Sequence, residues 1–142
     1  MRSCCRLLLM VCVSLCSGAA ASAGESCRVV SPKEASKQVA LAANEIRRYV
    51  FLRTGVMPVI ERSAPKTGDD HVRLVTDKAL GAQEYSLKTS SRDDGKTLTI
   101  SGGSDIAVLY GAYHFVEKLG VRFYIHGDTI PDKQIPCNRS RG

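Results

Sequence analysis

A short apolar run, Cys27 to Val30, predicts a strand. The segment that follows it is the first in which apolar residues recur with a helical period. Ser31-Pro32-Lys33-Glu34 then offers an N-cap serine, a proline at the first helical position and a capping-box glutamate. Gly55 stands where a C-terminal cap is expected. The sequence therefore predicts an amphipathic helix between Ser31 and Gly55, with one face made of Ala35, Val39, Ala42, Ala43, Ile46, Tyr49 and Val50.

Short segments rich in β-branched residues follow this helix and predict strands. Val56 to Ile60 and His71 to Val75 are separated by a polar loop that contains Pro65 and Gly68, and 77–83 predicts a turn or short helix. The stretches 85–88 and 97–100 alternate around the turn signal Asp93-Asp94-Gly95-Lys96. This alternation predicts a β-hairpin whose apolar side chains are Tyr85, Leu87, Leu98 and Ile100.

A second helix is predicted from Ser104, its cap, to Leu119, with Gly120 as its stop and Val121 to Ile125 as a last strand. Its apolar positions cover an arc of roughly 220°, against roughly 100° for packing on one side. Two interpretations follow. Either the helix is sandwiched inside this domain, or one flank packs on a further domain through the candidate interface residues Val108, Tyr110 and Tyr113.

The order of these elements predicts an α+β fold. Two main helices are expected to pack on one face of a mixed β-sheet, as a two-layer sandwich with a right-handed first crossover. The chain has 142 residues, of which 44% are hydrophobic and 24% charged, an ordinary globular composition. That length suits one core and is too short for a (β/α)8 barrel of roughly 250 residues.

The first 23 residues have the pattern of a secretory signal peptide. Arg2 and Arg6 precede an almost wholly apolar run from Leu7 to Leu15. Ala21-Ser22-Ala23 then forms an A-x-A cleavage site. The apolar run is shorter than the roughly 20 residues that a spanning helix needs. We therefore expect a secreted or periplasmic protein without a membrane anchor after cleavage, with a domain at 24–132 and a short tail at 133–142.

Charge and motif content indicate few partners. The formal net charge is +6, but the basic residues are dispersed and no aromatic-interleaved basic stripe exists, so we expect no nucleic-acid partner. His71, His114 and His126 lie far apart without metal-ligand spacing, so we expect no metal and no cofactor. The acidic pairs Asp69-Asp70 and Asp93-Asp94 lie in polar turns, which accounts for them without catalysis.

Two ordered motifs resemble a known accessory domain. AANEIRRYV at 42–50, followed by TGVMPV at 54–59, is similar to the pattern AA-x-E-L-x-x-Y-hydrophobic … T-G-x-x-x-P-I. LTISG at 98–102 with VLYGAYHFVEKLGVRFY at 108–124 resembles L-x-I-x-G … L-Y-G-x-Y-x-F-L-E-x-L-G-x-R-W-Y. The domain with these patterns precedes the catalytic barrel in α-glucuronidases and related glycoside hydrolases, and is similar to the second domain of β-hexosaminidases.

The resemblance implies an α+β domain in which no bond cleavage occurs, because the catalytic carboxylates of such enzymes belong to the (β/α)8 barrel that follows. It implies a barrel partner, in a full-length relative or in trans. The family's ending W-Y-x-P-G-E is altered here at Phe123, His126 and Asp128, so no catalytic residue is transferred. The main hypothesis is thus an exported noncatalytic accessory domain of a glycoside hydrolase.

Two alternatives remain. One is a free-standing module that binds a polysaccharide or a protein and uses the same fold as a scaffold. The other, a small standalone hydrolase, is the least favoured, because the sequence shows no convergent acid/base set.

The cysteines give a first testable prediction. Four of the six lie in the signal segment, which leaves Cys27 and Cys137, and two cysteines in an exported domain indicate one disulfide, with two separate thiols as the alternative. If the bridge forms, the intact mass of the unreduced protein lies about 2 Da below that of the reduced protein. Equal masses in the two states would eliminate the bridge.

Overall fold

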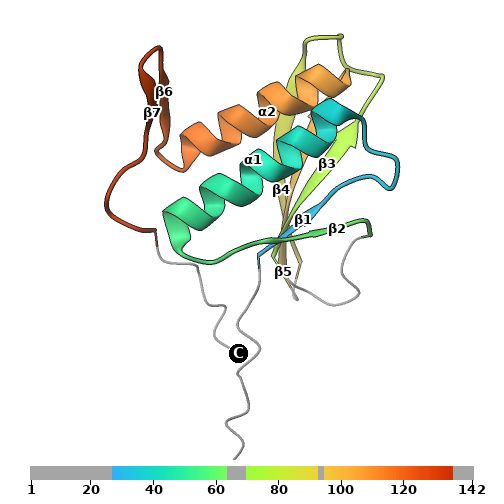
Figure 1. Ribbon diagram of the computed structural model, residues 1–142. Helices are drawn as coiled ribbons and strands as arrows, with labels where there is room; N and C mark the ends of the chain where they lie inside the picture. The colour runs from blue at the N-terminus through green and yellow to red at the C-terminus, as the bar shows by residue number, and fades with distance from the viewer. Residues whose placement is uncertain (1–26, 64–69, 93–94, 136–142) are drawn as a thin grey trace, which may run out of the picture.

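The computed structural model describes residues 27–63, 70–92 and 95–135. A five-stranded mixed sheet carries both helices on one face, and a separate two-stranded hairpin lies beyond the C-terminal end of the second helix (Figure 1). The predicted two-layer α+β class is confirmed. In chain order the elements are β1 (Arg28–Val30), α1 (Lys37–Thr54), β2 (Val59–Glu61), β3 (His71–Thr76), β4 (Tyr85–Arg92), β5 (Gly95–Gly102), α2 (Asp105–Lys118), β6 (Arg122–Tyr124) and β7 (Gly127–Thr129).

The strand order in the sheet is β2-β1-β3-β5-β4. The first four of these strands are parallel, and β4 pairs with β5 antiparallel, so the edges of the sheet are the three-residue β2 and the eight-residue β4. Because α1 follows β1 and α2 follows β5, both helices begin at the carboxyl ends of the parallel strands. They then run back side by side over one face of the sheet (Figure 1).

The core lies between the helices and that face of the sheet. Alternation along the strands directs every second side chain toward the helices, and the period of each helix supplies the matching apolar face. The core is formed by Val29, Val39, Ala42, Ala43, Ile46, Val50, Val72, Leu74, Ile100, Val108, Leu109 and Ala112.

No helix within the described part of the chain is both long and apolar enough to cross a membrane.

Three glycines set how closely α2 approaches its surroundings. A Cβ built at Gly102 would lie 2.3 Å from the Val108 backbone nitrogen, and one at Gly111 would lie 2.7 Å from Cγ2 of Ile100. At Gly103, a Cβ would lie 2.0 Å from the carbonyl oxygen of Gly81. Since real side chains do not tolerate such distances, the first turn and the middle of α2 can lie where they do only because these positions lack a Cβ.

The predicted start of the first helix is wrong by five residues. Ser36 is the N-cap of α1, and its hydroxyl accepts a hydrogen bond from the Val39 amide at 3.3 Å. The Ser31 amide instead donates to the Glu61 carbonyl at 2.9 Å and so continues the pairing of β1 with β2. This sheet bond holds Ser31 outside the helix, and it leaves Glu34 in a turn rather than in a capping box. The predicted C-cap is confirmed, because Gly55 has φ +73° and donates to Phe51.

The last predicted strand exists, but it does not join the main sheet. β6 pairs antiparallel with β7, a strand that the sequence did not predict, and the two form their own hairpin. The hairpin of β4 and β5 and the helix capped by Ser104 are confirmed, and 77–83 forms turns. The strand predicted at Val56 to Ile60 is shorter and begins later, as β2 (Val59–Glu61). The predictions for the signal segment, the loop with Pro65 and Gly68 and the tip at Asp93-Asp94 fall outside the described residues, as does most of the tail.

The close approach at Gly102 yields a stability prediction. Gly102→Ala forces α2 away from β5, and we expect it to lower the free energy of unfolding by about 3 kcal/mol. The measurement is a urea titration followed by circular dichroism.

Gly81→Ala is the matched control. Its Cβ would come no nearer than 3.5 Å to any neighbour, an ordinary contact, so its effect should stay within about 0.5 kcal/mol. Equal stability of the two variants would refute the proposed close packing.

Candidate functional site

Both helices carry apolar side chains on the side that faces away from the sheet. On α2, Ile106, Tyr110 and Tyr113, at the spacing i, i+4, i+7, share the side of the helix that lies away from its buried residues, such as Val108 and Ala112. Leu41 and Leu52 lie opposite the buried face of α1. We call these five residues the outer helix surface. Leu41 and Tyr110 are each 44% exposed, and Leu52 and Ile106 are 38% and 39% exposed.

The three predicted interface residues occupy different environments. Tyr110 lies on the outer helix surface, and Tyr113 is half-buried there with its ring 5.2 Å from that of Phe123. Val108 is fully buried in the core between α2 and the sheet and has no exposed surface. Most of the wide apolar arc of α2 is thus used inside this domain, against the sheet and α1, and only its outer stripe remains exposed.

The hairpin of β6 and β7 is attached to the helix layer by an aromatic cluster. Phe123 packs edge-on against both Tyr49 and Tyr113, with ring centroids 5.6 and 5.2 Å apart. The buried Tyr49 hydroxyl donates a hydrogen bond to the Asp128 carboxylate. These contacts fix the base of the hairpin, while Tyr124 and Ile125 near its tip are 62% and 98% exposed.

The two clustered tyrosines resist ionisation. Burial raises the pKa of Tyr49 above its ordinary value, and the hydrogen bond to Asp128 raises it further. Burial also raises the pKa of Tyr113, and the nearby Glu45 carboxylate adds to the effect. Tyr49 therefore remains a hydrogen-bond donor over the physiological pH range.

Arg53 joins the end of α1 to the segment that follows the hairpin. It is 5% exposed, and its guanidinium donates to the carbonyls of Leu119, Pro131 and Lys133 at 2.6–2.7 Å. Its own carbonyl accepts from the Ile135 amide at 2.7 Å. A planar guanidinium with several donors suits such a junction, because it satisfies carbonyls from separate segments at once.

A cavity lies at the carboxyl ends of β1 and β3, between the start of α1 and the start of α2. Its volume is about 810 Å³, and its walls include the carboxylates of Glu34 and Asp105. Glu34 is exposed, whereas the general acid of a glycosidase commonly sits in an apolar environment. Asp105 accepts a hydrogen bond from the Thr76 hydroxyl at 3.1 Å.

The histidines have ordinary partners or lie at the surface. His71 and His114 lie within 3.3 Å and 3.1 Å of the hydroxyls of Thr97 and Tyr85, and His126 is exposed. Asp70 accepts a hydrogen bond from the Lys96 amide of β5, so this carboxylate joins two segments rather than closing a local turn. Over 27–63, 70–92 and 95–135, no three potential metal-ligating side chains come together.

The predicted disulfide remains a prediction. Cys27 is half-buried at the start of β1 and packs against the core. Cys137 falls outside the described residues.

Several residues with defined roles are not apparent from the sequence pattern. The pairing of Tyr49 with Asp128 joins positions far apart in the chain, and no local spacing indicates it. Arg53 does carry a signal, since it is a charged residue on the otherwise apolar face of a predicted helix.

Comparison with known proteins gives a structural likeness but no sequence match. No family model matches the chain, and no curated protein matches it. Among solved structures, it is similar to a GH138 enzyme targeting pectin rhamnogalacturonan II, with a TM-score of 0.46 and 14% sequence identity. The likeness covers 67% of this chain and 10% of that one, so this chain spans about a tenth of the enzyme's length. A likeness at this level assigns no function.

The Tyr49–Asp128 hydrogen bond yields a pH-dependent prediction. Tyr49→Phe leaves the carboxylate without its phenol donor, and we expect a loss of about 1–3 kcal/mol at pH 7. Because the folded-state pKa of Tyr49 is raised, its contribution is complete below the unfolded value of about 10 and declines as the pH rises above it. The stability difference between wild type and Tyr49→Phe should therefore shrink above about pH 10 in urea titrations.

Tyr124→Phe is the control, since this tyrosine is largely exposed. This variant should have the same free energy of unfolding as wild type at pH 7. Above pH 10, its free energy of unfolding should decline as much as that of wild type. A constant difference between wild type and Tyr49→Phe from pH 7 to pH 11 would contradict the assigned role.

Proposed function

We propose that this chain is a noncatalytic accessory domain of the glycoside hydrolase type, and that its outer helix surface packs against a catalytic (β/α)8 barrel. The observation that carries the proposal is the apolar exposure on both helices on the side away from the sheet. Ile106 and Tyr110 are neighbours at i, i+4 on α2, and adjoining exposed apolar side chains commonly mark an interaction surface.

The sequence resemblance supports the same surface. Several residues of the two motifs have a structural role inside this domain. Ala42, Ala43 and Ala112 are buried in the core, and Gly111 allows α2 to approach Ile100 closely. Tyr110 belongs to the second motif, yet it is 44% exposed and contributes nothing to the core. A docked barrel would bury it.

The hairpin extends this surface. Phe123 connects its base to Tyr113, and Ile125 near its tip is almost completely exposed. Since the aromatic cluster and Tyr49 hold the hairpin in place, it presents its tip as a fixed projection beside the helices (Figure 1). A partner that covers the helices would meet the hairpin at the end of the layer.

A catalytic role for the chain itself is tested by an assay. A glycosidase needs two carboxyl groups held about 5–9.5 Å apart across the sugar, one of them acting as an acid. The exposed Glu34 and the hydrogen-bonded Asp105 do not provide an acid in an apolar environment. We therefore expect the purified chain to release no aryl alcohol from aryl glycosides above the uncatalysed rate.

Docking is tested with the barrel domain of an α-glucuronidase-type hydrolase freed of its own accessory domain. We expect the full chain to bind the barrel, and Tyr110→Lys to weaken binding at least about tenfold, because a charge would be buried in an apolar interface. Isothermal calorimetry measures the affinity, and hydrogen exchange should show protection around Ile106, Tyr110 and Ile125.

Lys88→Ser on the opposite side of the sheet is the matched control and should bind like wild type. The proposal fails if the chain alone hydrolyses glycosides, or if Tyr110→Lys and Lys88→Ser bind the barrel equally.

A further inference from the structure

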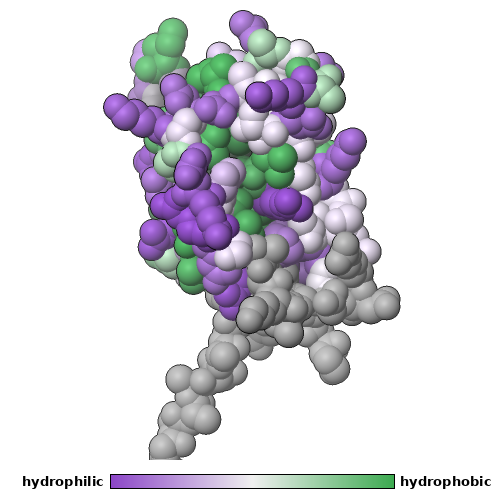
Figure 2. Space-filling model, turned by 90° about the vertical axis from the view of Figure 1, so that its right-hand side faces the viewer, coloured by the Kyte–Doolittle hydropathy of each residue, from purple (hydrophilic) through white to green (hydrophobic). Residues whose placement is uncertain are grey.

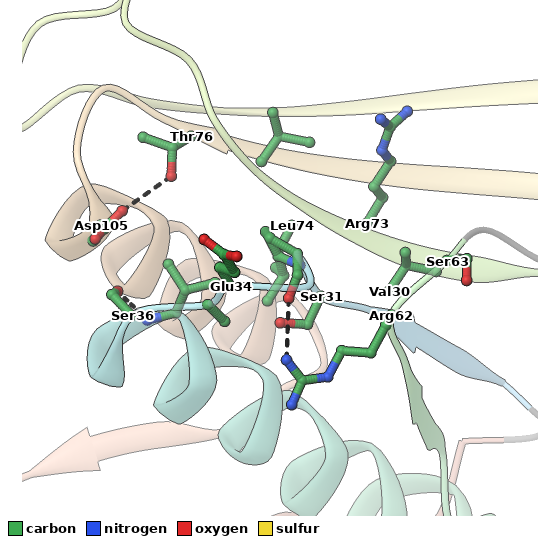
Figure 3. Close-up of a pocket in the computed structure, with 14 residues that line it drawn as sticks. Val30, Ser31, Glu34, Ser36, Arg62, Ser63, Arg73, Leu74, Thr76 and Asp105 are labelled. Carbon is green, nitrogen blue, oxygen red and sulfur yellow. Dashed lines mark hydrogen bonds between the residues drawn. The ribbon is translucent and has the colours of Figure 1, made fainter.

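We propose that the cavity at the carboxyl ends of β1 and β3 binds a neutral, polyhydroxylated ligand of the size of one or two sugar rings. Its volume of about 810 Å³ lies within the range of about 300–1,000 Å³ found for small-molecule sites. The loop from Ser31 to Ser36 lies on the side of the molecule shown in Figure 2, where apolar residues are visible between hydrophilic ones. Figure 3 shows how the lining side chains are arranged.

The strand topology creates this opening. β1 has β2 on one side and β3 on the other, and the chain leaves β1 for α1 at this point. A crevice forms outside the carboxyl ends of parallel strands where successive connections diverge, and open α/β sheets commonly bind ligands there. The cavity therefore occupies a position that favours a ligand site on topological grounds.

The backbone of β3 adds polar groups to the cavity wall. The last pair between β1 and β3 is Val30 with Arg73, but β3 continues to Thr76. The chain beyond Ser31 continues with Pro32, which has no N–H to extend the ladder. Among the described strands, Leu74 to Thr76 thus have no neighbour on their β1 side, and all three residues line the cavity.

Ser31 is the second observation that points to a ligand. Its side chain lines the cavity, yet the residue is only 4% exposed. Within the described part of the chain its hydroxyl has no hydrogen-bond partner, although its amide is bonded to Glu61. Because it opens on the cavity rather than being sealed in the core, this hydroxyl can exchange water for a ligand hydroxyl.

The charges around the cavity define the class of ligand. The guanidinium of Arg62 and the carboxylates of Glu34 and Asp105 lie at the cavity, whereas the Arg73 side chain points to the opposite face of the sheet from Leu74 (Figure 3). A polyanion would be repelled by the two carboxylates, and a purely apolar molecule would desolvate them without offering a hydrogen-bond donor. A sugar offers hydroxyl donors to the carboxylates and oxygen acceptors to Arg62 and Ser31.

Apolar walls complete the match. Val30, Val39, Leu74 and Val75 line the cavity between the polar groups. The carbon-bound faces of a sugar ring can lie against such side chains while its hydroxyls reach the polar ones. The Arg62 guanidinium also donates to the carbonyls of Pro32 and Lys33, so the loop that forms one wall is held by a residue that lines the cavity (Figure 3).

This inference does not rest on the proposed docking of a barrel. The cavity lies at the carboxyl ends of the strands, whereas the outer helix surface is formed by the sides of the helices that face away from the sheet. Sugar binding without barrel docking, or the reverse, would identify which of the two proposals is wrong.

The test is a titration of the ¹⁵N-labelled full chain with cellobiose, followed by amide chemical shifts. We expect a dissociation constant of about 1 mM, with shifts concentrated at residues 31–36 and 74–76. Inorganic phosphate is titrated in parallel as a probe for an anion site. Shifts with phosphate but not with cellobiose, or no shifts at these residues with either probe, would overturn the proposal.

Ser31→Ala separates a ligand role from a structural one. It removes a hydroxyl that has no internal partner, so we expect unchanged or higher stability together with cellobiose binding weakened about fivefold. Ser90→Ala, the same change at an exposed serine of β4, should leave both quantities unchanged. Loss of stability in Ser31→Ala with unchanged binding would show a structural hydroxyl and overturn the assignment.

Discussion

The close approach of α2 to the sheet is the constraint on which the other features depend. Gly102 and Gly103 bring its first turn against the end of β5 and the turn at Gly81, and Gly111 lets the middle of the helix touch Ile100. This places Leu109 and Val116 where α1 and the aromatic cluster can cover them. With side chains at these glycines, α2 would stand away from the sheet, and the packing against α1 and the hairpin would change with it.

The sequence predicted those elements whose signals are local. The helix periods, the Gly55 cap, the Ser104 cap and the alternation of β4 and β5 are all set by neighbouring residues, and each was found. The start of α1 was misjudged because Ser31 forms a sheet bond to Glu61, a contact that capping rules cannot see. The strand β6 was predicted without its partner β7, because periodicity identifies a strand but does not name the strand that it pairs with.

The candidate sites divide in the same way, into features that neighbouring residues indicate and features that depend on distant contacts. Tyr110 was found because the helical wheel of α2 has more apolar surface than one neighbour can cover. Val108 was included with it because the sequence does not say which part of that surface meets the sheet, and it lies in the core. The cavity could not be predicted, since its walls come from the ends of β1 and β3, the segment after β2 and the starts of two helices, which only folding brings together.

The long edge strand β4 bears on the behaviour of this protein at high concentration. Its outer edge has no neighbouring strand within the described sheet, and it is eight residues long, whereas the other edge, β2, has three. Unpaired strand edges are templates for pairing between molecules, and proteins commonly restrain them with charged or strongly hydrated side chains. Lys88, Thr89, Ser90 and Ser91 are exposed along this edge, so hydrated side chains and the charge of Lys88 protect it against self-association.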